Sequence, residues 1–462
     1  MLIQFAVENF LSFKDEAVLN LIATKDTTHT EHLVSEKGTS KLAILPLAAI
    51  YGANASGKSN FIEALAFAQS LIVKGTRGEQ FISLTPFKLN STNPHNSSRF
   101  DFTIKYKDVT YNYGFVIKSS VVVEEWLFAT LKRTEVKYFE RTTSDSGKIH
   151  VEFGSSFSDK KTKKQKQFYD FVAQGTRKNQ LFLTEAGERN ILKVAPLLEW
   201  FKHVLTIIPA ESKYGGLEIK TNSDDAFNSY IGSFLATAGT GISGVSANEE
   251  SLDFEKSFPD FPPELKESII SSVNDQEDKP LIINISGKQG VLRKANGKIL
   301  LMTLKTRHAT EGGSFINFDI SEESEGTQRL LHLIPALYAL KTEEKVIVID
   351  ELDRRLHPSL TKMIVENALL HRNGSTKSGQ LIFSTHETNL LDLEMLRRDE
   401  VWLVEKDNGG ASHLYSLADF KIRPDLRLQK GYLSGRFGAI PFIGDLSKLG
   451  WASEEEKNGT HI

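Results

Sequence analysis

Residues 44–67 read ILPLAAIYGANASGKSNFIEALAF, and the patterns in this stretch are the strongest indication of the fold. A short apolar run, typical of a buried strand, leads into the loop GANASGKS at 52–59, and apolar residues at helical spacing follow it. This order matches the G-x-x-x-x-G-K-[ST] phosphate-binding loop, which lies between a strand and a helix. The residues predicted to bind ATP here are Gly52, Ala53, Asn54, Ala55, Ser56, Gly57, Lys58 and Ser59.

The residue types in this loop predict how it holds a nucleotide. Glycine at 52 and 57 allows backbone angles that side chains forbid, so that successive N–H groups meet phosphate oxygens at the start of a helix. Lys58 is expected to reach the β and γ phosphates, and Ser59 is expected to ligate Mg²⁺. The loop therefore predicts that the chain uses ATP and Mg²⁺.

The composition excludes several classes of protein. With 462 residues the chain exceeds one usual compact unit, which indicates a core domain with a large insertion or two domains. A net charge of -3 argues against a general polyanion-binding protein, and the absence of cysteine excludes disulfides, thiolate metal sites and cysteine nucleophiles. The N-terminus has no signal-peptide pattern, and no apolar run approaches the roughly 20 residues that span a bilayer. We therefore expect a cytoplasmic protein with no membrane segment.

Alternating polar and apolar residues, rich in aromatic and β-branched types, predict antiparallel strands at 1–21 and at 99–131. Residues 168–254 are predicted to be mainly helical, and further strands are expected at 280–285 and 298–304. No sustained heptad pattern appears in the middle of the chain, so long coiled-coil arms are not expected. The middle of the chain should therefore form a compact lobe.

Two segments have open interpretations. Five lysines fall within residues 160–166, KKTKKQK, where a solvated loop is favoured and a contact with nucleic acid or a partner is the alternative. Residues 420–446, FKIRPDLRLQKGYLSGRFGAIPFIGDL, combine glycine, aromatic and basic residues. This second segment is either a cap on the core or a docking segment for a partner.

A second group of nucleotide-site residues is predicted at 345–356, KVIVIDELDRRL. Its continuous β-branched run is typical of a central parallel strand buried on both faces, and the run ends in Asp350 and Glu351. Asp350 suits an outer-sphere contact to Mg²⁺, and Glu351 is placed to accept a proton from the water that attacks the γ phosphate. Residues 380–392, QLIFSTHETNLLD, predict another buried strand that ends near His386.

Ser324 and Gly326 open an amphipathic helix in the stretch SEGTQRLL. A serine hydroxyl and free N–H groups at a helix start form a second anion site. The stretch resembles the signature motif of ABC ATPases, which in that family contacts the γ phosphate bound to the opposite subunit, although it departs from L-S-G-G-Q at three positions. His386 likewise resembles the switch histidine of those ATPases, which senses the γ phosphate. Asp353 falls where that family places its dimer-contacting loop.

Together these motifs resemble the AAA15 group of ABC-type ATPases, which includes RloA- and AbiLi-like proteins and is similar to the ATPase components AriA of PARIS and PtuA of Septu anti-phage systems. The resemblance implies an α/β fold, namely an ABC-type P-loop ATPase head with a mixed sheet and an antiparallel β lobe. This head would carry a compact, mainly helical insertion and no long coiled coil. The implied domains are an N-terminal half of the head at 1–135, the inserted lobe at 136–305 and a C-terminal half of the head at 306–462.

The resemblance also implies a mechanism and partners. At least two subunits would form composite ATP sites, with the catalytic residues Glu351 and His386 from one and with Ser324 and Gly326 from the other. The implied role is a sensor or scaffold in bacterial anti-phage defence by abortive infection. It would control a separately encoded effector, a nuclease of Toprim, RloB-like or HNH type, with a phage protein as trigger. The alternative is a RecF-like DNA repair ATPase, and the sequence leaves DNA binding open.

Overall fold

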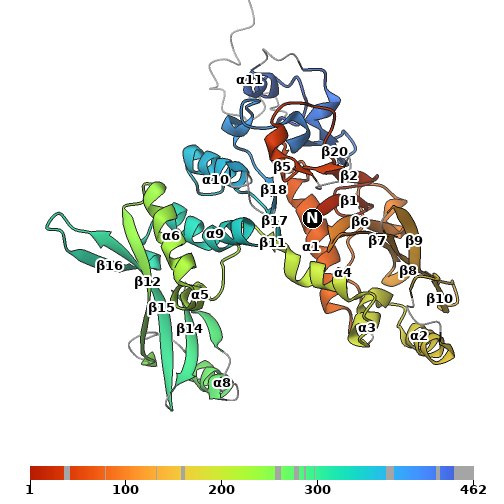
Figure 1. Cartoon of the computed structure of the whole chain (residues 1–462), viewed down its shortest axis with the longest axis horizontal. Helices are drawn as coiled ribbons and strands as arrows, with labels where there is room; N and C mark the ends of the chain where they lie inside the picture. The colour runs from red at the N-terminus through yellow and green to blue at the C-terminus, as the bar shows by residue number, and fades with distance from the viewer. Residues whose placement is uncertain are drawn as a thin grey trace, which may run out of the picture.

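The computed structural model describes residues 1–35, 42–78, 80–131, 133–157, 162–254, 262–274, 280–285, 288–295, 297–370, 379–422 and 427–441. Three main sheets are arranged across the molecule. Figure 1 shows the N-terminal antiparallel sheet on the right, a largely parallel sheet in the middle and a second antiparallel sheet on the left. The predicted phosphate loop, Asp350, Glu351 and His386 follow strands of the middle sheet, so this sheet positions them.

The central sheet has the order β11-β17-β18-β5-β19-β20, and its first five strands run parallel. Its strands are β5 (Leu47–Tyr51), β11 (Leu205–Ile208), β17 (Val346–Ile349), β18 (Gln380–Ser384), β19 (Val401–Lys406) and β20 (Ser412–Ser416). β5, β17 and β18 are buried along their whole length, as expected for parallel strands that are covered on both faces. Because parallel strands end at the same edge, the segments that follow these three strands meet there.

Helices cover both faces of the central sheet. α1 (Lys58–Lys74) shares one hydrophobic core with Ile50 of β5, and α9 (Glu325–Thr342) and α10 (Pro358–Leu370) share the other core with Ala49. Successive side chains of β5 thus enter opposite cores, as the pleat of a strand requires. The sheet is held between two apolar layers, which fixes the strand ends that carry the predicted motifs.

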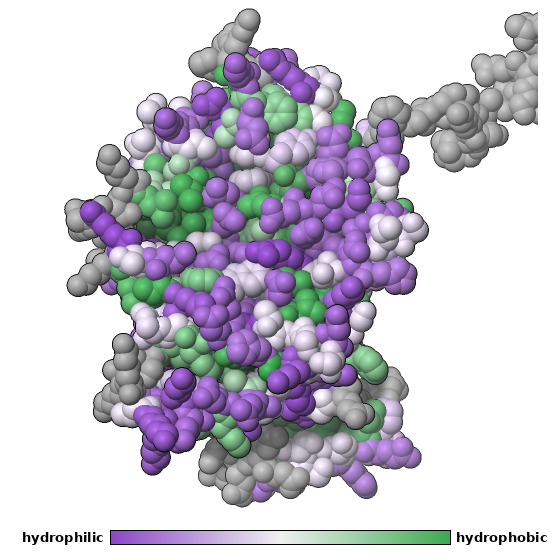
Figure 2. All heavy atoms as spheres, turned by 90° about the vertical axis from the view of Figure 1, so that its right-hand side faces the viewer, coloured by the Kyte–Doolittle hydropathy of each residue, from purple (hydrophilic) through white to green (hydrophobic). Residues whose placement is uncertain are grey.

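The N-terminal sheet is antiparallel and has the order β10-β9-β8-β7-β6-β1-β2. Its strands are β1 (Leu2–Glu8), β2 (Ala17–Asn20), β6 (Ser98–Tyr106), β7 (Val109–Lys118), β8 (Val121–Leu131), β9 (Thr134–Thr143) and β10 (Ile149–Phe153). Alternate residues of β6 are buried, which is the period of a half-buried strand. The strands predicted within 1–21 and 99–131 are confirmed, and the sheet continues past residue 135. The face of the molecule on this side is largely hydrophilic, with separate hydrophobic clusters (Figure 2).

The helix α2 changes the interpretation of the lysine cluster. Helices in this part of the chain are α2 (Lys163–Gly175), α3 (Phe182–Glu188) and α4 (Ala195–Glu199), which continues into a π-helical turn at Trp200–Val204. Thr162 caps α2, because its Oγ1 accepts from the Gln165 N–H at 3.3 Å. The lysines at 163, 164 and 166 are exposed, as predicted, but they lie on a helix, so the prediction of a loop is wrong for them. Residues 158–161 lie outside the described ranges.

The third sheet occupies much of the region that was expected to be mainly helical. Its strands are β12 (Ile242–Ser251), β13 (Leu281–Ile285), β14 (Lys288–Ala295), β15 (Lys298–Ala309) and β16 (Phe315–Asp319), accompanied by α5 (Leu217–Ser223), α6 (Asp225–Thr237) and α8 (Pro263–Asn274). The strands predicted at 280–285 and 298–304 are confirmed as β13 and β15. A mainly helical insertion at 136–305 needs correction, because strands of all three sheets lie in it. The largely exposed, polar second half of β12 hides this strand in the sequence.

The predicted fold class is otherwise confirmed, because an α/β core with a strand-loop-helix at 47–74 lies beside an antiparallel β lobe. Within the described ranges there is no long coiled coil, and no helix is both long and apolar enough to cross a membrane. The remaining elements are β3 (Val34–Ser35), β4 (Ala43–Ile44), α11 (Leu428–Leu433) and 3-10 turns at Thr30–His32, Asn93–His95, Ile320–Glu322, Thr388–Leu390, Arg398–Glu400 and Leu417–Asp419.

Candidate functional site

The loop between β5 and α1 depends on its two outer glycines. Gly57 has φ +120°, and a Cβ there would lie 2.3 Å from Ser412 Oγ and 2.8 Å from Ser12 Oγ. A Cβ at Gly52 would lie 2.4 Å from the carbonyl oxygen of Val404. Both positions therefore require glycine. The loop fits closely against β19, β20 and the turn that follows β1.

Lys58 is buried at the start of α1, and its ammonium turns back across the loop. Lys58 Nζ donates to the carbonyl oxygens of Gly52, at 2.9 Å, and Ala53, at 3.1 Å. Burial lowers the pKa of Lys58 to about 8, while the carboxylates that follow β17 act in the opposite direction. An anion in the loop would offset the cost of burying this charge. Ser59 is exposed on the first turn of the same helix.

The two residues after β17 are fixed through Ser384, the last residue of β18. Ser384 Oγ donates to Asp350 Oδ1 at 2.5 Å and accepts from the Glu351 N–H at 2.8 Å. Asp350 is buried, whereas Glu351 is partly exposed. One hydroxyl thus ties both acidic residues to the neighbouring strand at the edge of the sheet.

Glu351 has a second restraint that the sequence analysis missed. Its φ is +50°, which is uncommon for a residue with a side chain, and its Oε2 accepts from Arg354 Nη1 at 2.7 Å. Arg354 also forms an ion pair with Glu211, which lies 143 residues earlier in the chain. The guanidinium therefore orients the Glu351 carboxylate. A contact between segments so far apart leaves no local signal in the sequence.

His386 follows β18 and lies with the same group. Its backbone N–H donates to the carboxylate of Asp353, at 3.3 and 3.4 Å. Burial lowers the pKa of the His386 imidazole, and the charge of Lys58 adds to this effect. The carboxylates of Asp353, Glu351 and Asp350 oppose it. The imidazole is therefore mostly neutral at pH 7 and close enough to Lys58 to interact with its charge.

The segment that resembles a signature motif forms the start of α9, which packs against Arg355, four residues after Glu351. Ser324 is exposed and caps the helix, because its Oγ accepts from the Thr327 N–H at 3.2 Å. A Cβ at Gly326 would lie 2.8 Å from the carbonyl oxygen of Arg355, so glycine permits close packing here. Among the residues described, the contacts of Ser324 and Gly326 are with α9 and Arg355, and none joins them to the group around Lys58.

The C-terminal glycine-rich and aromatic segment packs onto the core as far as it is described. The Tyr432 hydroxyl donates to the carbonyl oxygen of Ala439 at 2.9 Å, and the Tyr432 ring meets the Tyr51 ring edge-on at 6.0 Å. Phe437 is buried in the same core as β5. These contacts support the interpretation as a cap for residues 427–441. Residues 423–426 and 442–446 of the predicted segment lie outside the described ranges.

Solved structures similar to this chain are heads of SMC proteins. One is the SmcHead bound to the C-winged helix domain of ScpA, with 12% identity and a TM-score of 0.38; the match covers 90% of this chain and 97% of that chain. Another is the SMC head domain from Thermotoga maritima, with 14% identity and a TM-score of 0.36; the match covers 91% of this chain and 99% of that chain. A third is the Smc head domain with an extended coiled coil bound to the C-terminal domain of ScpA derived from Pyrococcus furiosus. It has 13% identity and a TM-score of 0.37, and the match covers 90% of this chain and 96% of that chain. Values this low establish no functional relation.

A comparison with curated protein sequences finds no match. A family model described as "AAA domain, putative AbiEii toxin, Type IV TA system" matches residues 47–392. This range is well over half of the chain, begins with β5 and extends past His386, so it contains the loop, the acidic residues after β17 and the histidine. The chain therefore belongs to this family of AAA domains, and it is an ATPase.

Proposed function

We propose that the chain is an ATP-dependent switch that joins two copies of itself through shared ATP sites. One observation carries this proposal: Lys58 lies with Asp350, Glu351 and His386, whereas the exposed Ser324 hydroxyl caps α9 and has no hydrogen bond to that group within the described ranges. An exposed helix start with a serine hydroxyl is favourable for an anion. A twofold dimer supplies one, because each helix start then faces the loop of the other copy.

Features of the loop fit ATP with Mg²⁺. The Ser56 hydroxyl is buried without a hydrogen-bond partner in the described part of the chain, and the Lys58 ammonium is turned over the loop. Phosphate oxygens would give both groups a charged partner. Ser59 and Asp350 are the residues that would hold Mg²⁺, which when bound neutralises phosphate charge and orients the phosphates.

The contacts that position the remaining residues suggest a role for each of them. Glu351, held by Ser384 and Arg354, would accept a proton from the attacking water. The neutral imidazole of His386 would donate a hydrogen bond to the γ phosphate. Ser324 and Gly326 of the second copy would complete the site with a hydroxyl and free N–H groups. Turnover then requires two chains, whereas binding of ATP requires one.

For the biological role we propose a sensor or scaffold component of bacterial anti-phage defence, within the AAA15 group and similar to AriA and PtuA. The family description, which mentions a putative toxin and a type IV toxin–antitoxin system, supports a role of this kind. The ATP-driven dimer would control a separately encoded effector, a nuclease of Toprim, RloB-like or HNH type, and a phage protein would act as trigger.

The test is a phage challenge of bacteria that express the chain together with its neighbouring gene. We expect protection with the wild-type chain, loss of protection with Lys58→Ala, and co-purification of the neighbouring product with the wild-type chain. The control is Lys74→Ala, an exposed lysine at the other end of α1, which should leave protection intact.

Two outcomes would contradict the defence role. One is protection that does not change in the Lys58→Ala variant. The other is turnover that double-stranded DNA stimulates without any partner protein, at a stated salt concentration, which would favour a DNA repair ATPase instead.

A further inference from the structure

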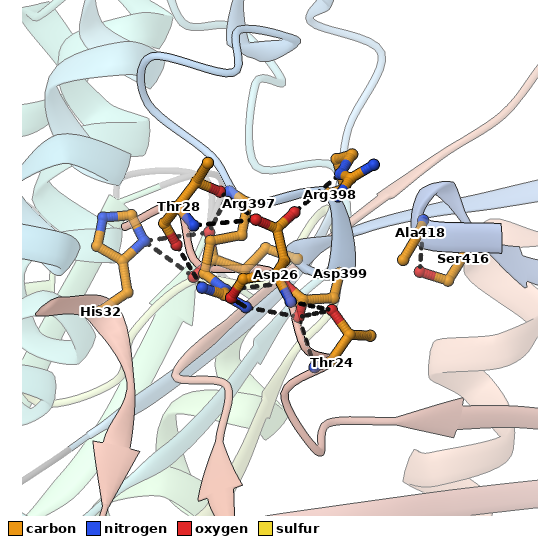
Figure 3. A network of polar contacts seen from close by, with 10 residues as sticks. Thr24, Asp26, Thr28, His32, Arg397, Arg398, Asp399, Ser416 and Ala418 are labelled. Atoms are coloured by element: carbon orange, nitrogen blue, oxygen red, sulfur yellow. Dashed lines mark hydrogen bonds and ion pairs between the residues drawn. The ribbon is translucent and has the colours of Figure 1, made fainter. Parts of the chain in front are cut away.

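Two segments that are far apart in the sequence are joined next to the central sheet, namely residues 24–32 and 393–400. The buried Arg397 forms a bidentate ion pair with Asp399, with N–O distances of 2.9 and 2.8 Å. Its guanidinium also donates to the backbone carbonyl oxygens of Asp26, at 3.1 Å, and Thr28. Figure 3 shows these contacts with His32 beside them. The network fixes the backbone directly before the sequence His29-Thr30-Glu31-His32.

Asp26 and Asp399 secure the same segment from the other side. Asp399 Oδ2 accepts from both the N–H and the hydroxyl of Thr24, each at 2.8 Å. Asp26 Oδ2 accepts from Arg398 Nε at 2.8 Å. Because side chains from 397–399 hold several points of the loop, the loop is preorganised rather than merely exposed.

His29 is held with one ring nitrogen turned toward a carboxylate. Its Nε2 lies 2.8 Å from the carbonyl oxygen of Leu393, and since a carbonyl only accepts, Nε2 carries the hydrogen. In a neutral ring Nδ1 then carries a lone pair. This Nδ1 lies 3.2 Å from Glu31 Oε1, so two electron-rich atoms face each other. Such a pair requires a cation or an additional proton between the two atoms.

His32 is arranged in the same way. Its Nδ1 lies 3.1 and 3.2 Å from the two carboxylate oxygens of Glu400, which is fully buried. Donation from Nδ1 to the carboxylate leaves Nε2 with a lone pair. The rings of His29 and His32 stack, with centroids 5.0 Å apart and planes at 14°. In metal sites, a ligating histidine usually donates its second nitrogen to a carboxylate or a backbone carbonyl, and both histidines do so here.

We propose that His29, Glu31 and His32 bind one Zn²⁺ ion, or a similar first-row transition metal, with solvent as the fourth ligand. One ligand atom of each residue lies within 4.8 Å of the other two. Bonds of about 2 Å in a tetrahedral zinc site space the ligand atoms about 3.3 Å apart, and the pair of His29 Nδ1 and Glu31 Oε1 already has this spacing. Two imidazoles and a carboxylate favour Zn²⁺ over Mg²⁺.

The metal would lie where two parts of the ATPase fold meet. All three ligands lie in or next to the turn Thr30–His32, while the groups that orient the rings, Leu393 and Glu400, belong to the segment before β19. Since β19 pairs with β5, the ion would brace a turn whose hydrogen bonds join it to the sheet that carries the phosphate loop. This site is separate from the residues proposed to hold Mg²⁺.

The experiment uses the full chain without a polyhistidine tag and without nucleotide. Equilibrium dialysis against Zn²⁺ and Co²⁺ gives the stoichiometry, and the visible absorption of bound Co²⁺ reports four-coordinate geometry. We expect one metal per chain, at least tenfold weaker binding in His29→Gln and Glu31→Gln, and about 10- to 100-fold weaker binding in Glu400→Gln. The control is His150→Gln, an exposed histidine of β10, which should bind as the wild type does.

His29 and Glu31 are accessible, so their variants test the site even where a change at the buried Glu400 prevents folding. Either of two results would overturn the proposal. One is less than one metal per chain in the wild type, which would mean that a proton rather than a metal lies between His29 and Glu31. The other is metal binding that is the same in His29→Gln and Glu31→Gln as in the wild type.

Discussion

The phosphate loop and the start of α9 differ in the side chains that surround each of them within one chain. The loop lies against β19 and β20, and Lys58 meets the carboxylates after β17 within the same chain. The start of α9 offers the capping hydroxyl of Ser324 and the glycine at 326, and it packs against Arg355, which also pairs with Glu325. Both helix starts could bind an anion, and we propose that the first supplies the groups for phosphoryl transfer, namely Lys58 and the carboxylates after β17.

In the proposed dimer, ATP binding and ATP turnover have separate requirements. Binding of ATP should depend on the loop of one chain, and hydrolysis should also depend on the helix start of a second chain. Substitutions in the loop should therefore change ATP affinity and turnover, whereas substitutions at the start of α9 should change turnover alone.

Lys58→Ala should have the largest effect, because it removes the buried cation from the loop. We expect turnover to fall on the order of 1000-fold and ATP affinity to fall with it. Titration calorimetry with ATP and an assay of phosphate release would measure both. Lys74→Ala is the matched control on the same helix, and unchanged ATP affinity in Lys58→Ala would show that the loop does not hold the nucleotide.

Glu351→Gln should separate binding from turnover. The amide keeps the size of the side chain but cannot accept the proton, so we expect turnover to fall roughly 100- to 1000-fold while ATP stays bound. Light scattering during gel filtration should then show a stable dimer with ATP and a monomer without it. Wild-type turnover in this variant would exclude Glu351 as the base.

Ser324→Asp should impair turnover without impairing binding by one chain. Aspartate preserves the helix cap but brings a negative charge toward the phosphate of the second copy, so we expect turnover to fall on the order of 100-fold. ATP affinity at low protein concentration should stay within about twofold of the wild type. Ser324→Asn keeps the helix cap without the negative charge and should lose less turnover than Ser324→Asp. An equal loss of turnover in both variants would argue against a nearby phosphate.

The pH dependence of ATP binding should show the smallest effect. Only the protonated Lys58 attracts phosphate, and its pKa of about 8 means that this form is lost as the pH rises above 8. We expect affinity to weaken by up to about tenfold per pH unit above that value. Lys58→Arg should bind more weakly but without this dependence, because arginine stays charged. An affinity that is constant from pH 7 to pH 9.5 would contradict the lowered pKa.

The loop, the strands beside it and the grouping of Lys58 with Asp350, Glu351 and His386 were predictable from sequence. Each depends on a local pattern, and parallel strands bring the ends of β5, β17 and β18 to one edge. The start of α9 was equally predictable as a capped helix.

Other features depend on contacts between residues far apart in the sequence, which no local pattern predicts. Arg354 orients Glu351 and also pairs with Glu211, which follows β11. The buried Arg397 joins residues 26–28 to the segment before β19. In the third sheet, β13 and β15 are predictable from their sequence, but β12 is not, because much of it is polar and exposed and its alternation of burial is weak. The spacing of His29, Glu31 and His32 is visible in the sequence, but the groups that hydrogen-bond to the two histidines, Leu393 and Glu400, lie more than 360 residues away.

Mixing two inactive variants tests the shared site most directly. In a dimer of Lys58→Ala with Ser324→Asp, one of the two sites has an intact Lys58 from one chain and an intact Ser324 from the other. An equimolar mixture should therefore regain about a quarter of wild-type turnover, since about half of the dimers are mixed and each has one intact site. If the mixture has no more activity than the two variants measured separately, the ATP site is not shared between two copies.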